Sequence, residues 1–336
     1  MYRVIRMKLI IVDCLRYDIA SDPKIMPTLN KEMHLQPIYA VANTTEPSIA
    51  SILIGDYPHR HGFMGLGQKD SKEILRRELP KEVRNWHMFS PAICFKPFTR
   101  FQKGKYYPQI ELRSADETQI IHLMDVHDYK HRDDWRKFYH GYEELVDETE
   151  HMQYNLPKEK GWGRPWRTHA GDIDDAGKLK AYYKAAAHNV DKFISSLLDN
   201  DELVMVTADH GEGFGEKGIV FRHQDLYDFM VKVPFAINRE IEPPKLFDHT
   251  DILKIILGKE LRERKYSYQV ENTWQRSFRV TDREGNYLIY HDPANRVYDH
   301  PTWEGDGRLQ PILEKELEEV PDRPPALIEG QDLSIG

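Results

Sequence analysis

The sequence predicts an α/β fold with a mostly parallel central sheet flanked by helices and a small antiparallel sheet near the C-terminus. Three observations support this prediction. Apolar runs at Lys8–Val12 and from Leu203 onward end abruptly in acidic residues, as expected of strands buried on both faces. A long amphipathic pattern over residues 176–198 leads directly into the second run. Two short strand-like segments late in the chain are separated by a turn.

Length, charge and cysteine content limit the classes of protein that fit. The 336 residues allow about two domains, and we divide the chain into an α/β domain at 1–262 and a C-terminal β subdomain with a tail at 263–336. The net charge of -8 argues against a general polyanion binder, so no nucleic-acid partner is expected. The two cysteines, Cys14 and Cys94, argue against a disulfide framework.

The N-terminal apolar run is too short for a secretion signal or a membrane span. We interpret it as the first core strand, and we expect a cytoplasmic protein without a membrane span. Homo-oligomerisation is left open.

Asp13 directly follows the first predicted strand, Lys8–Val12. In open α/β sheets, residues just beyond the carboxyl ends of strands commonly form metal or ligand sites. An acidic residue there is also a good helix or turn starter, so the position alone leaves both interpretations open. A second short strand is expected at 38–42, after a connection that contains prolines.

Residues 43–62 predict a short helix that begins at Thr45 and stops at Gly55. The N–H groups and the positive dipole end at its N-terminus favour an anion such as phosphate or sulfate beside Thr45. A threonine hydroxyl is a poor nucleophile at neutral pH unless a base or a metal activates it. The alternative is a simple helix cap, which stabilises a helix by about 1 kcal/mol.

The middle of the chain contains a long irregular insertion, around residues 131–172, that fits no single helix or strand pattern. Such an insertion is typical of a functional loop or lid, although a solvated surface is the alternative for each of its cations. The helix predicted over 176–198 follows, and we expect His188 within it to be structural or exposed rather than catalytic. A β-hairpin is predicted from Ser277–Thr281 and Tyr287–Tyr290.

The late apolar run leads into Asp209, His210 and three glycines. An adjacent carboxylate and imidazole are donors suited to Zn²⁺ or Mn²⁺, and the glycines let the backbone bend closely around an ion. A solvated turn is the alternative for an isolated Asp-His pair.

Four segments together resemble the sulfatase branch of the alkaline phosphatase superfamily in order and spacing. They are VDCLRYD at 12–18, TEPSIASILIGDYPHRHG at 45–62, HLMDVHDY at 122–129 and VTADHGEGFGE at 206–216. The resemblance continues through 222–237, 247–258 and 278–299, so it covers nearly the whole chain. It implies an alkaline phosphatase-like catalytic domain and a small C-terminal sheet.

The resemblance also implies roles for individual residues. Asp13, Thr45, Asp209 and His210 match the metal ligands, and Thr45 matches the nucleophile. His127 and His223 match positions near the transferred group or the metal, so they are candidate catalytic residues, with a structural or surface role as the alternative. One divalent ion is implied; a second is an open alternative, with Asp125, His127, His131 and His223 as candidate ligands.

Two departures from the family pattern change the expected chemistry. Sulfatases carry C/S-x-P-S-R at this helix, where Cys or Ser becomes formylglycine, whereas this chain has Thr45 and Ile49 at the first and last positions. The resemblance therefore favours hydrolysis of phosphate esters, either phosphodiesters or phosphonate monoesters, through a phospho-threonine. Cys14 replaces a second Asp that binds calcium, which favours Mn²⁺ or Zn²⁺ over Ca²⁺ or Mg²⁺.

Three other functions remain as alternatives. The chain is a sulfatase if sulfate esters are its substrates. It is a phosphotransferase if a phospho-alcohol group moves to a sugar acceptor, and it is a binding protein if the fold is kept without catalysis. The expected substrate is a small-molecule or glycan-linked ester.

Overall fold

The computed structural model describes residues 7–110, 118–128, 173–199, 201–218, 223, 225–271, 276–292, 302–318 and 320. The insertion predicted around 131–172, with His131, and the tail from 321 lie outside the described residues. Among the helices in the described part, none combines the length and apolar character needed to cross a membrane.

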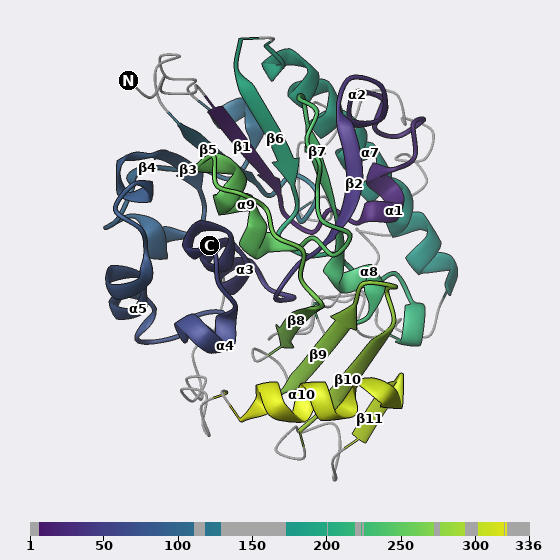
Figure 1. Ribbon diagram of the computed structural model, residues 1–336. Helices are drawn as coiled ribbons and strands as arrows, with labels where there is room; N and C mark the ends of the chain where they lie inside the picture. Colours follow the sequence, from purple (N-terminus) through teal and green to yellow (C-terminus); the bar gives the residue numbers. More distant parts are fainter. Residues whose placement is uncertain are drawn as a thin grey trace, which may run out of the picture.

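A seven-stranded sheet forms the centre of the molecule (Figure 1). Its strands are β1 (Met7–Val12), β2 (His34–Tyr39), β3 (His87–Ser90), β4 (Arg100–Lys103), β5 (Gln119–Leu123), β6 (Leu203–Thr207) and β7 (Lys232–Ile237). They lie in the order β2-β7-β6-β1-β5-β3-β4; β7 runs antiparallel to β2 and β6, and the other neighbouring pairs are parallel. The predicted mostly parallel sheet is thus confirmed.

Helices flank this sheet on both sides of the view in Figure 1, with α3 and α9 packed together and α7 packed with α1 and α2. The α-helices are α1 (Tyr17–Ala20), α2 (Pro27–Lys31), α3 (Thr45–Ile54), α4 (Pro58–His61), α5 (Ser71–Glu78), α7 (Ile173–Leu197), α8 (Asp228–Val231), α9 (His249–Ile256) and α10 (Gln310–Leu317). Apolar residues of the central strands and of most of these helices form one large core, whereas α8 and α10 contribute to two smaller clusters.

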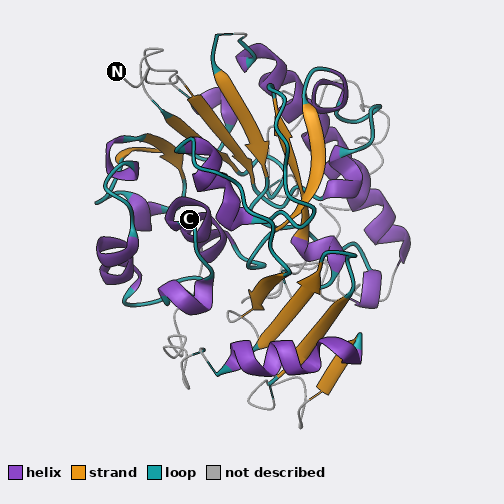
Figure 2. Cartoon of the chain, viewed as in Figure 1, coloured by secondary structure: helices purple, strands orange, loops and turns teal. Residues whose placement is uncertain are grey.

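A second, four-stranded antiparallel sheet follows in the sequence and is separate from the first in Figure 2. Its strands are β8 (Tyr266–Glu271), β9 (Ser277–Asp282), β10 (Tyr287–His291) and β11 (Thr302–Gly305), in the order β11-β10-β9-β8. The buried guanidinium of Arg279 donates hydrogen bonds from this sheet to the Leu226 carbonyl at 2.7 Å and to the Asp228 carboxylate at 2.6 Å. These bonds connect the small sheet to the start of α8 and to the residues just before it.

Most of the elements expected from the sequence are present. The helix α3 begins at Thr45, and Gly55 ends it in the left-handed region with φ 82°. The hairpin of β9 and β10 and the long helix α7 also form where they were predicted. His188 bonds through Nδ1 to the carbonyl of Ile25 at 2.8 Å, in keeping with a structural role.

The second strand, β2, runs from His34 to Tyr39, so the predicted range of 38–42 lay too late in the sequence. Pro37 lies inside it and pairs with Pro234 of β7. A proline is tolerated there because β2 is an edge strand and needs no ladder bond on its outer side. The division of the chain at residue 262 stays a prediction.

Candidate metal centre

The candidate site lies at the carboxyl ends of four adjacent strands, β6, β1, β5 and β3. Asp209 and His210 follow β6, Asp13 follows β1, His122 is in β5, and Ser90 ends β3. All five side chains are buried. Parallel strands bring their carboxyl ends to the same edge of a sheet, so residues far apart in the sequence meet here.

Three buried atoms meet at this edge without a hydrogen-bond partner in the described part of the chain: Oδ1 of Asp13, Oδ2 of Asp209 and Nε2 of His210. His210 donates its Nδ1 hydrogen to the carbonyl of Gly211 at 2.8 Å, because a carbonyl can only accept. Its Nε2 therefore carries a lone pair and faces two carboxylate oxygens. Three acceptors turned toward one another without a donor indicate a position for a cation.

The distances among these atoms fit a shared ion. Nε2 of His210 lies 3.4 Å from Oδ2 of Asp209 and 3.8 Å from Oδ1 of Asp13. Nitrogen and oxygen ligands at about 2.0–2.1 Å from a tetrahedral zinc ion are separated from each other by roughly 3.3 Å. Small closing movements would bring all three into range, so these residues fit the metal that the resemblance implies.

The electrostatics of the two carboxylates also favour a cation between them. Burial raises the pKa of Asp209, and the negative charge of Asp13 raises it further. Burial would raise the pKa of Asp13 as well, but His127, His122 and His210 together lower it well below its ordinary value. Two buried carboxylates this close resist ionising together unless a positive charge is shared between them.

Thr45 reaches the site from the first residue of α3. Its hydroxyl donates a hydrogen bond to Oδ2 of Asp13 at 3.1 Å. Thr44 occupies the N-cap position and its side chain makes no cap hydrogen bond, so Thr45 is not the cap. The hydroxyl thus lies between a carboxylate and the N-terminus of a helix, where backbone N–H groups favour an anion.

A buried chain of hydrogen bonds holds Asp13 from behind. Nε2 of His122 donates to Oδ2 of Asp13 at 3.0 Å, and the Ser90 hydroxyl bonds to Nδ1 of His122 at 2.9 Å. Ser90 also accepts from the N–H of Ala92 at 3.0 Å, so its own hydrogen is directed at His122. This arrangement sets the neutral imidazole with its hydrogen on Nε2. Neither His122 nor Ser90 was predicted as a site residue from the sequence.

His127, His223 and Cys14 lie beside the first cluster. The rings of His127 and His223 have centroids 5.3 Å apart, and those of His210 and His223 are 4.4 Å apart. Cys14 Sγ lies 3.3 Å from Nε2 of His223. Burial, followed by the charge of His210, lowers the pKa of His223 to about 3, so its imidazole is neutral at physiological pH.

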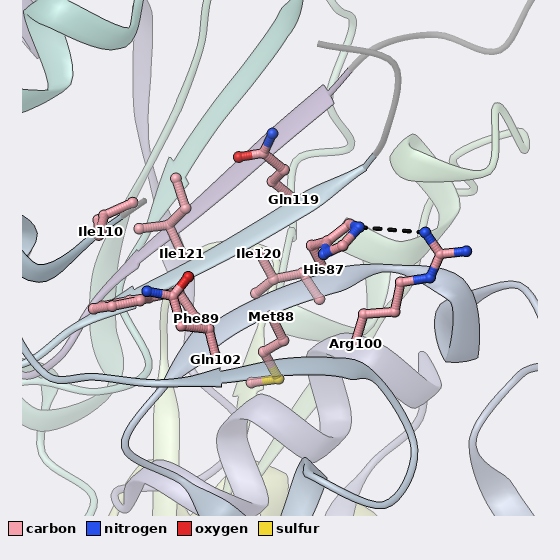
Figure 3. A pocket seen from close by; sticks show the side chains of 9 residues that line it. All are labelled: His87, Met88, Phe89, Arg100, Gln102, Ile110, Gln119, Ile120 and Ile121. Atoms are coloured by element: carbon pink, nitrogen blue, oxygen red, sulfur yellow. Dashed lines mark hydrogen bonds between the residues drawn. The ribbon is translucent and has the colours of Figure 1, made fainter. Parts of the chain in front are cut away.

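Two of the pockets in the described part of the chain lie away from this centre. Figure 3 shows one, which lies over the amino-terminal ends of β3, β4 and β5, near His87, Arg100 and Gln119. Its volume is about 20 Å³, roughly that of one water molecule. A larger, open hollow of about 410 Å³ lies near Tyr57 and Arg264. Neither contains a residue of the candidate site.

Comparison with known proteins identifies the fold. No protein-family model matches the chain, and no curated protein matches it by sequence. By structure, it is similar to a 2-O GAG sulfatase with a TM-score of 0.61 and 11% identity, covering 94% of this chain and 91% of that one. A protein solved with its substrate D-glucosamine-2-N,6-O-disulfate gives 0.61 and 15%, covering 96% and 99%.

The phosphonate monoester hydrolase of Agrobacterium radiobacter gives a TM-score of 0.57 and 12% identity, covering 94% of this chain and 95% of that one. Sulfatases and phosphonate monoester hydrolases are thus both among the structural neighbours. Together these likenesses confirm the predicted sulfatase-like fold.

Proposed function

We propose that this chain, which has the sulfatase-like fold, is a metal-dependent hydrolase of phosphate esters that uses Thr45 as its nucleophile. The observation that carries the proposal is the 3.1 Å contact between the Thr45 hydroxyl and Oδ2 of Asp13. Beside it lie three buried ligand atoms that have no hydrogen-bond partner among the described residues. A hydroxyl in this position can attack an ester phosphorus that is held at the N-terminus of α3.

Asp13, Asp209 and His210 would hold the divalent ion, with the Thr45 oxygen as a further ligand. When bound, the ion lowers the pKa of a nearby hydroxyl and neutralises negative charge that develops during phosphoryl transfer. We favour Mn²⁺ or Zn²⁺, because one imidazole and two carboxylates are donors suited to both.

The residues of the chain would supply the remaining steps. Oδ2 of Asp13 orients the Thr45 hydroxyl, and His122 fixes the carboxylate of Asp13. The Thr45 hydroxyl loses its proton to solvent, and its oxygen forms a bond to phosphorus while the bond from phosphorus to the leaving oxygen breaks. His127 donates a proton, or His223 donates a hydrogen bond, to that leaving oxygen; proton donation contributes about 10²- to 10⁴-fold in such reactions. Water then attacks the same phosphorus and breaks its bond to the Thr45 oxygen, which releases a phosphate monoester from a diester substrate or a phosphonate from a phosphonate monoester.

Three observations bear on the substrate, the location and the partners. A structural neighbour was solved with a sugar sulfate, so a small-molecule or glycan-linked ester is a reasonable substrate class to propose. Neither cysteine forms a disulfide, which supports the proposed cytoplasmic location. No nucleic-acid partner is proposed, given the net charge of -8.

The test is a matched pair of valine substitutions at neighbouring threonines. Thr45→Val removes the hydroxyl and keeps the shape of the side chain, and Thr44→Val makes the same change one residue away. With Mn²⁺ or Zn²⁺ present, we expect Thr45→Val to lose turnover of an aryl phosphodiester and an aryl phosphonate by about 10³-fold or more. Thr44→Val should retain most of the activity.

Two further measurements separate the alternatives. Acid-quenched wild-type protein should yield, in mass spectrometry, a Thr45 peptide carrying the substrate's phosphorus group without its leaving alcohol. Turnover of an aryl sulfate in preference to the phosphodiester would identify a sulfatase, and transfer to a sugar acceptor in preference to water would identify a phosphotransferase. A Thr45→Val variant with near wild-type turnover would rule out the nucleophile assignment.

A further inference from the structure

We infer that Asn43 is a positioning residue that holds His223 in a fixed place relative to Thr45. The inference rests on the proposed function, in which His223 donates a hydrogen bond to the leaving oxygen. Asn43 is fully buried, and both hydrogens of its amide are used. Its Nδ2 donates to the carbonyl of His223 at 2.8 Å and to the carbonyl of Asp225 at 3.1 Å.

The orientation of the Asn43 amide follows from these two neighbours. Carbonyl oxygens can only accept, so the NH₂ group must face them and the amide oxygen must face away. That oxygen has no hydrogen-bond partner among the described residues, and buried polar atoms of this kind are uncommon in proteins. The two donated bonds therefore orient the amide, which serves the segment that carries His223.

The backbone around Asn43 is connected to the start of α3, where Thr45 lies two residues further on. Ser48 of α3 donates from its hydroxyl to the carbonyl of Ala42 at 3.1 Å. Ala42 also pairs with Val270 of β8 in a parallel bridge. These contacts fix Asn43 relative to the first turn of α3, so its amide links the place of the nucleophile to the place of His223.

The residues after His223 have a backbone that needs such support. Asp225 has φ 69°, in the left-handed region that residues other than glycine seldom adopt, and its Oδ1 accepts from the N–H of Leu226 at 2.9 Å. Conformations of this kind persist where surrounding contacts hold them. Arg279 of the small sheet binds the Leu226 carbonyl and Asp228. Asn43 thus holds one end of this turn, and the small sheet holds the other.

The ring of His223 lies close enough to the candidate centre for its position to matter. Its centroid is 4.4 Å from that of His210 and 5.3 Å from that of His127. A displacement of about 1 Å at a reacting centre can reduce the rate by about 10²-fold. Because Asn43 holds the carbonyl of the same residue, loss of its amide should move the ring.

The test is a double-substitution cycle with Asn43→Ala and His223→Ala. Asn43→Ala alone should lower kcat by about 10- to 100-fold with little change in KM. In the His223→Ala background the same substitution should cost less than about 2-fold, because the group that it positions is gone. Equal effects in the two backgrounds would mean that Asn43 acts without His223 and would overturn the inference.

Asn30→Ala is the matched control. Asn30 also donates from Nδ2 to two backbone carbonyls, those of Ala20 and Met26, each at 2.8 Å. It belongs to α2, which contributes no residue to the candidate centre. This variant should keep kcat within about 2-fold of the wild type. If Asn43→Ala does not fold, Asn43→Ser, which keeps one donor in a smaller side chain, goes through the same cycle with a smaller loss expected.

A series of aryl phosphodiesters with different leaving phenols gives a second readout. A hydrogen bond to the leaving oxygen matters most when the phenol is a poor leaving group. Both Asn43→Ala and His223→Ala should therefore make turnover fall more steeply as the pKa of the phenol rises. A steeper fall in His223→Ala beside an unchanged one in Asn43→Ala would contradict the inference.

NMR of protein labelled with ¹⁵N in the histidine rings gives a readout that needs no turnover. The His223 signal, identified by its absence from His223→Ala, should shift in Asn43→Ala and stay in place in Asn30→Ala. If this holds but the wild type hydrolyses no phosphate ester, the positioning of the ring stands and the proposed function fails. If the wild type hydrolyses phosphodiesters but the two asparagine variants are alike in turnover and in this signal, the inference fails and the proposed function stands.

Discussion

The Nε2 atom of His122 lies 3.0 Å from Oδ2 of Asp13, and the same oxygen accepts the hydrogen bond of the Thr45 hydroxyl at 3.1 Å. One carboxylate oxygen thus receives two donors, while the other oxygen of Asp13 points toward Asp209 and His210. His122 therefore positions the candidate metal ligand Asp13 and, through it, the hydroxyl of Thr45. His122 itself is neither a candidate ligand nor the candidate nucleophile. Ser90 on the adjacent strand completes this support.

This arrangement predicts the effect of changing His122. His122→Phe keeps the ring volume and removes the donor, so Asp13 should lose its fixed orientation. We expect metal affinity to fall by about 10- to 100-fold, as for other outer-shell partners of metal ligands. Isothermal titration with Zn²⁺ measures this directly. Ser90→Ala should have a smaller effect in the same direction, and unchanged affinity in His122→Phe would show that Asp13 is held by other contacts.

The substitution Asp209→Asn should change the stability of the protein in opposite directions with and without metal. In the metal-free protein, Asp209→Asn removes a buried negative charge next to Asp13 and places an N–H donor near Nε2 of His210. We expect this variant to be at least as stable as the wild type in the presence of chelator, because burial and Asp13 disfavour the ionised Asp209.

Saturating metal should reverse that order. A ligand at 100 times its Kd stabilises the folded state by about 2.7 kcal/mol, and Asp209→Asn should lose much of this gain. Thermal melts with chelator and with Zn²⁺ provide the comparison. A metal-free variant that is much less stable than the wild type would mean that Asp209 has a structural role and is not kept for a cation.

Much of this site was predictable from strand ends. Asp13 and Asp209 each follow an apolar run, and the carboxyl ends of parallel strands share an edge, so their proximity follows from the fold class. Thr45 was predictable as a helix start. In each case, a change from apolar to polar residues marks the position in the sequence.

Other parts of the site leave no such mark. His122 is inside the apolar segment QIIHL, where one polar residue has the pattern of a satisfied core histidine. Cys14 was noted only as the loss of a carboxylate, because its position among three histidines depends on a left-handed backbone. Tyr183, in α7, holds Cys14 from across the core, and no local pattern connects residues so far apart.

A buried ion pair away from the site predicts a dependence of stability on pH. Arg264 donates to Oδ2 of Asp248 at 2.6 Å and also pairs with Asp251, and Tyr57 donates to the same Asp248 oxygen at 2.8 Å. Burial alone would raise the pKa of Asp248, but Arg264 and the hydroxyl donors lower it below 3.8. The stabilising contribution is therefore present at neutral pH and is lost as the pH falls through that lowered pKa.

Asp248→Asn should remove this contribution. The variant leaves Arg264 without its carboxylate partner at position 248. We expect the free energy of unfolding at pH 7 to fall by about 3–5 kcal/mol. Its stability should also vary less than that of the wild type between pH 5 and pH 2, since the titrating group is gone. Denaturant unfolding at several pH values tests both statements. Asp306→Asn, in an exposed pair with Arg308, is the control and should change little.

Gly211, which follows the candidate metal ligands Asp209 and His210, packs closely against the backbone of α8. A Cβ atom at this position would lie 2.0 Å from the carbonyl oxygen of Phe229 and 2.9 Å from its carbonyl carbon. Both atoms belong to the backbone of α8, and the N–H of Gly211 donates to the carbonyl of Met230 at 2.7 Å. Because the contacting atoms are backbone atoms, a change of side-chain rotamer cannot relieve the clash. An added methyl group must therefore push the loop or the helix aside.

Gly211→Ala should therefore destabilise the protein by about 1–3 kcal/mol or more, as overpacking does elsewhere. The displacement would also move His210, whose Nδ1 bonds to the Gly211 carbonyl, so zinc affinity should fall together with stability. Gly307→Ala is the matched control, because a Cβ there meets no atom within 4 Å. Equal melting temperatures and equal zinc affinities for the two variants would show that the loop has room to move, and the close fit between Gly211 and α8 would then have no part in holding His210.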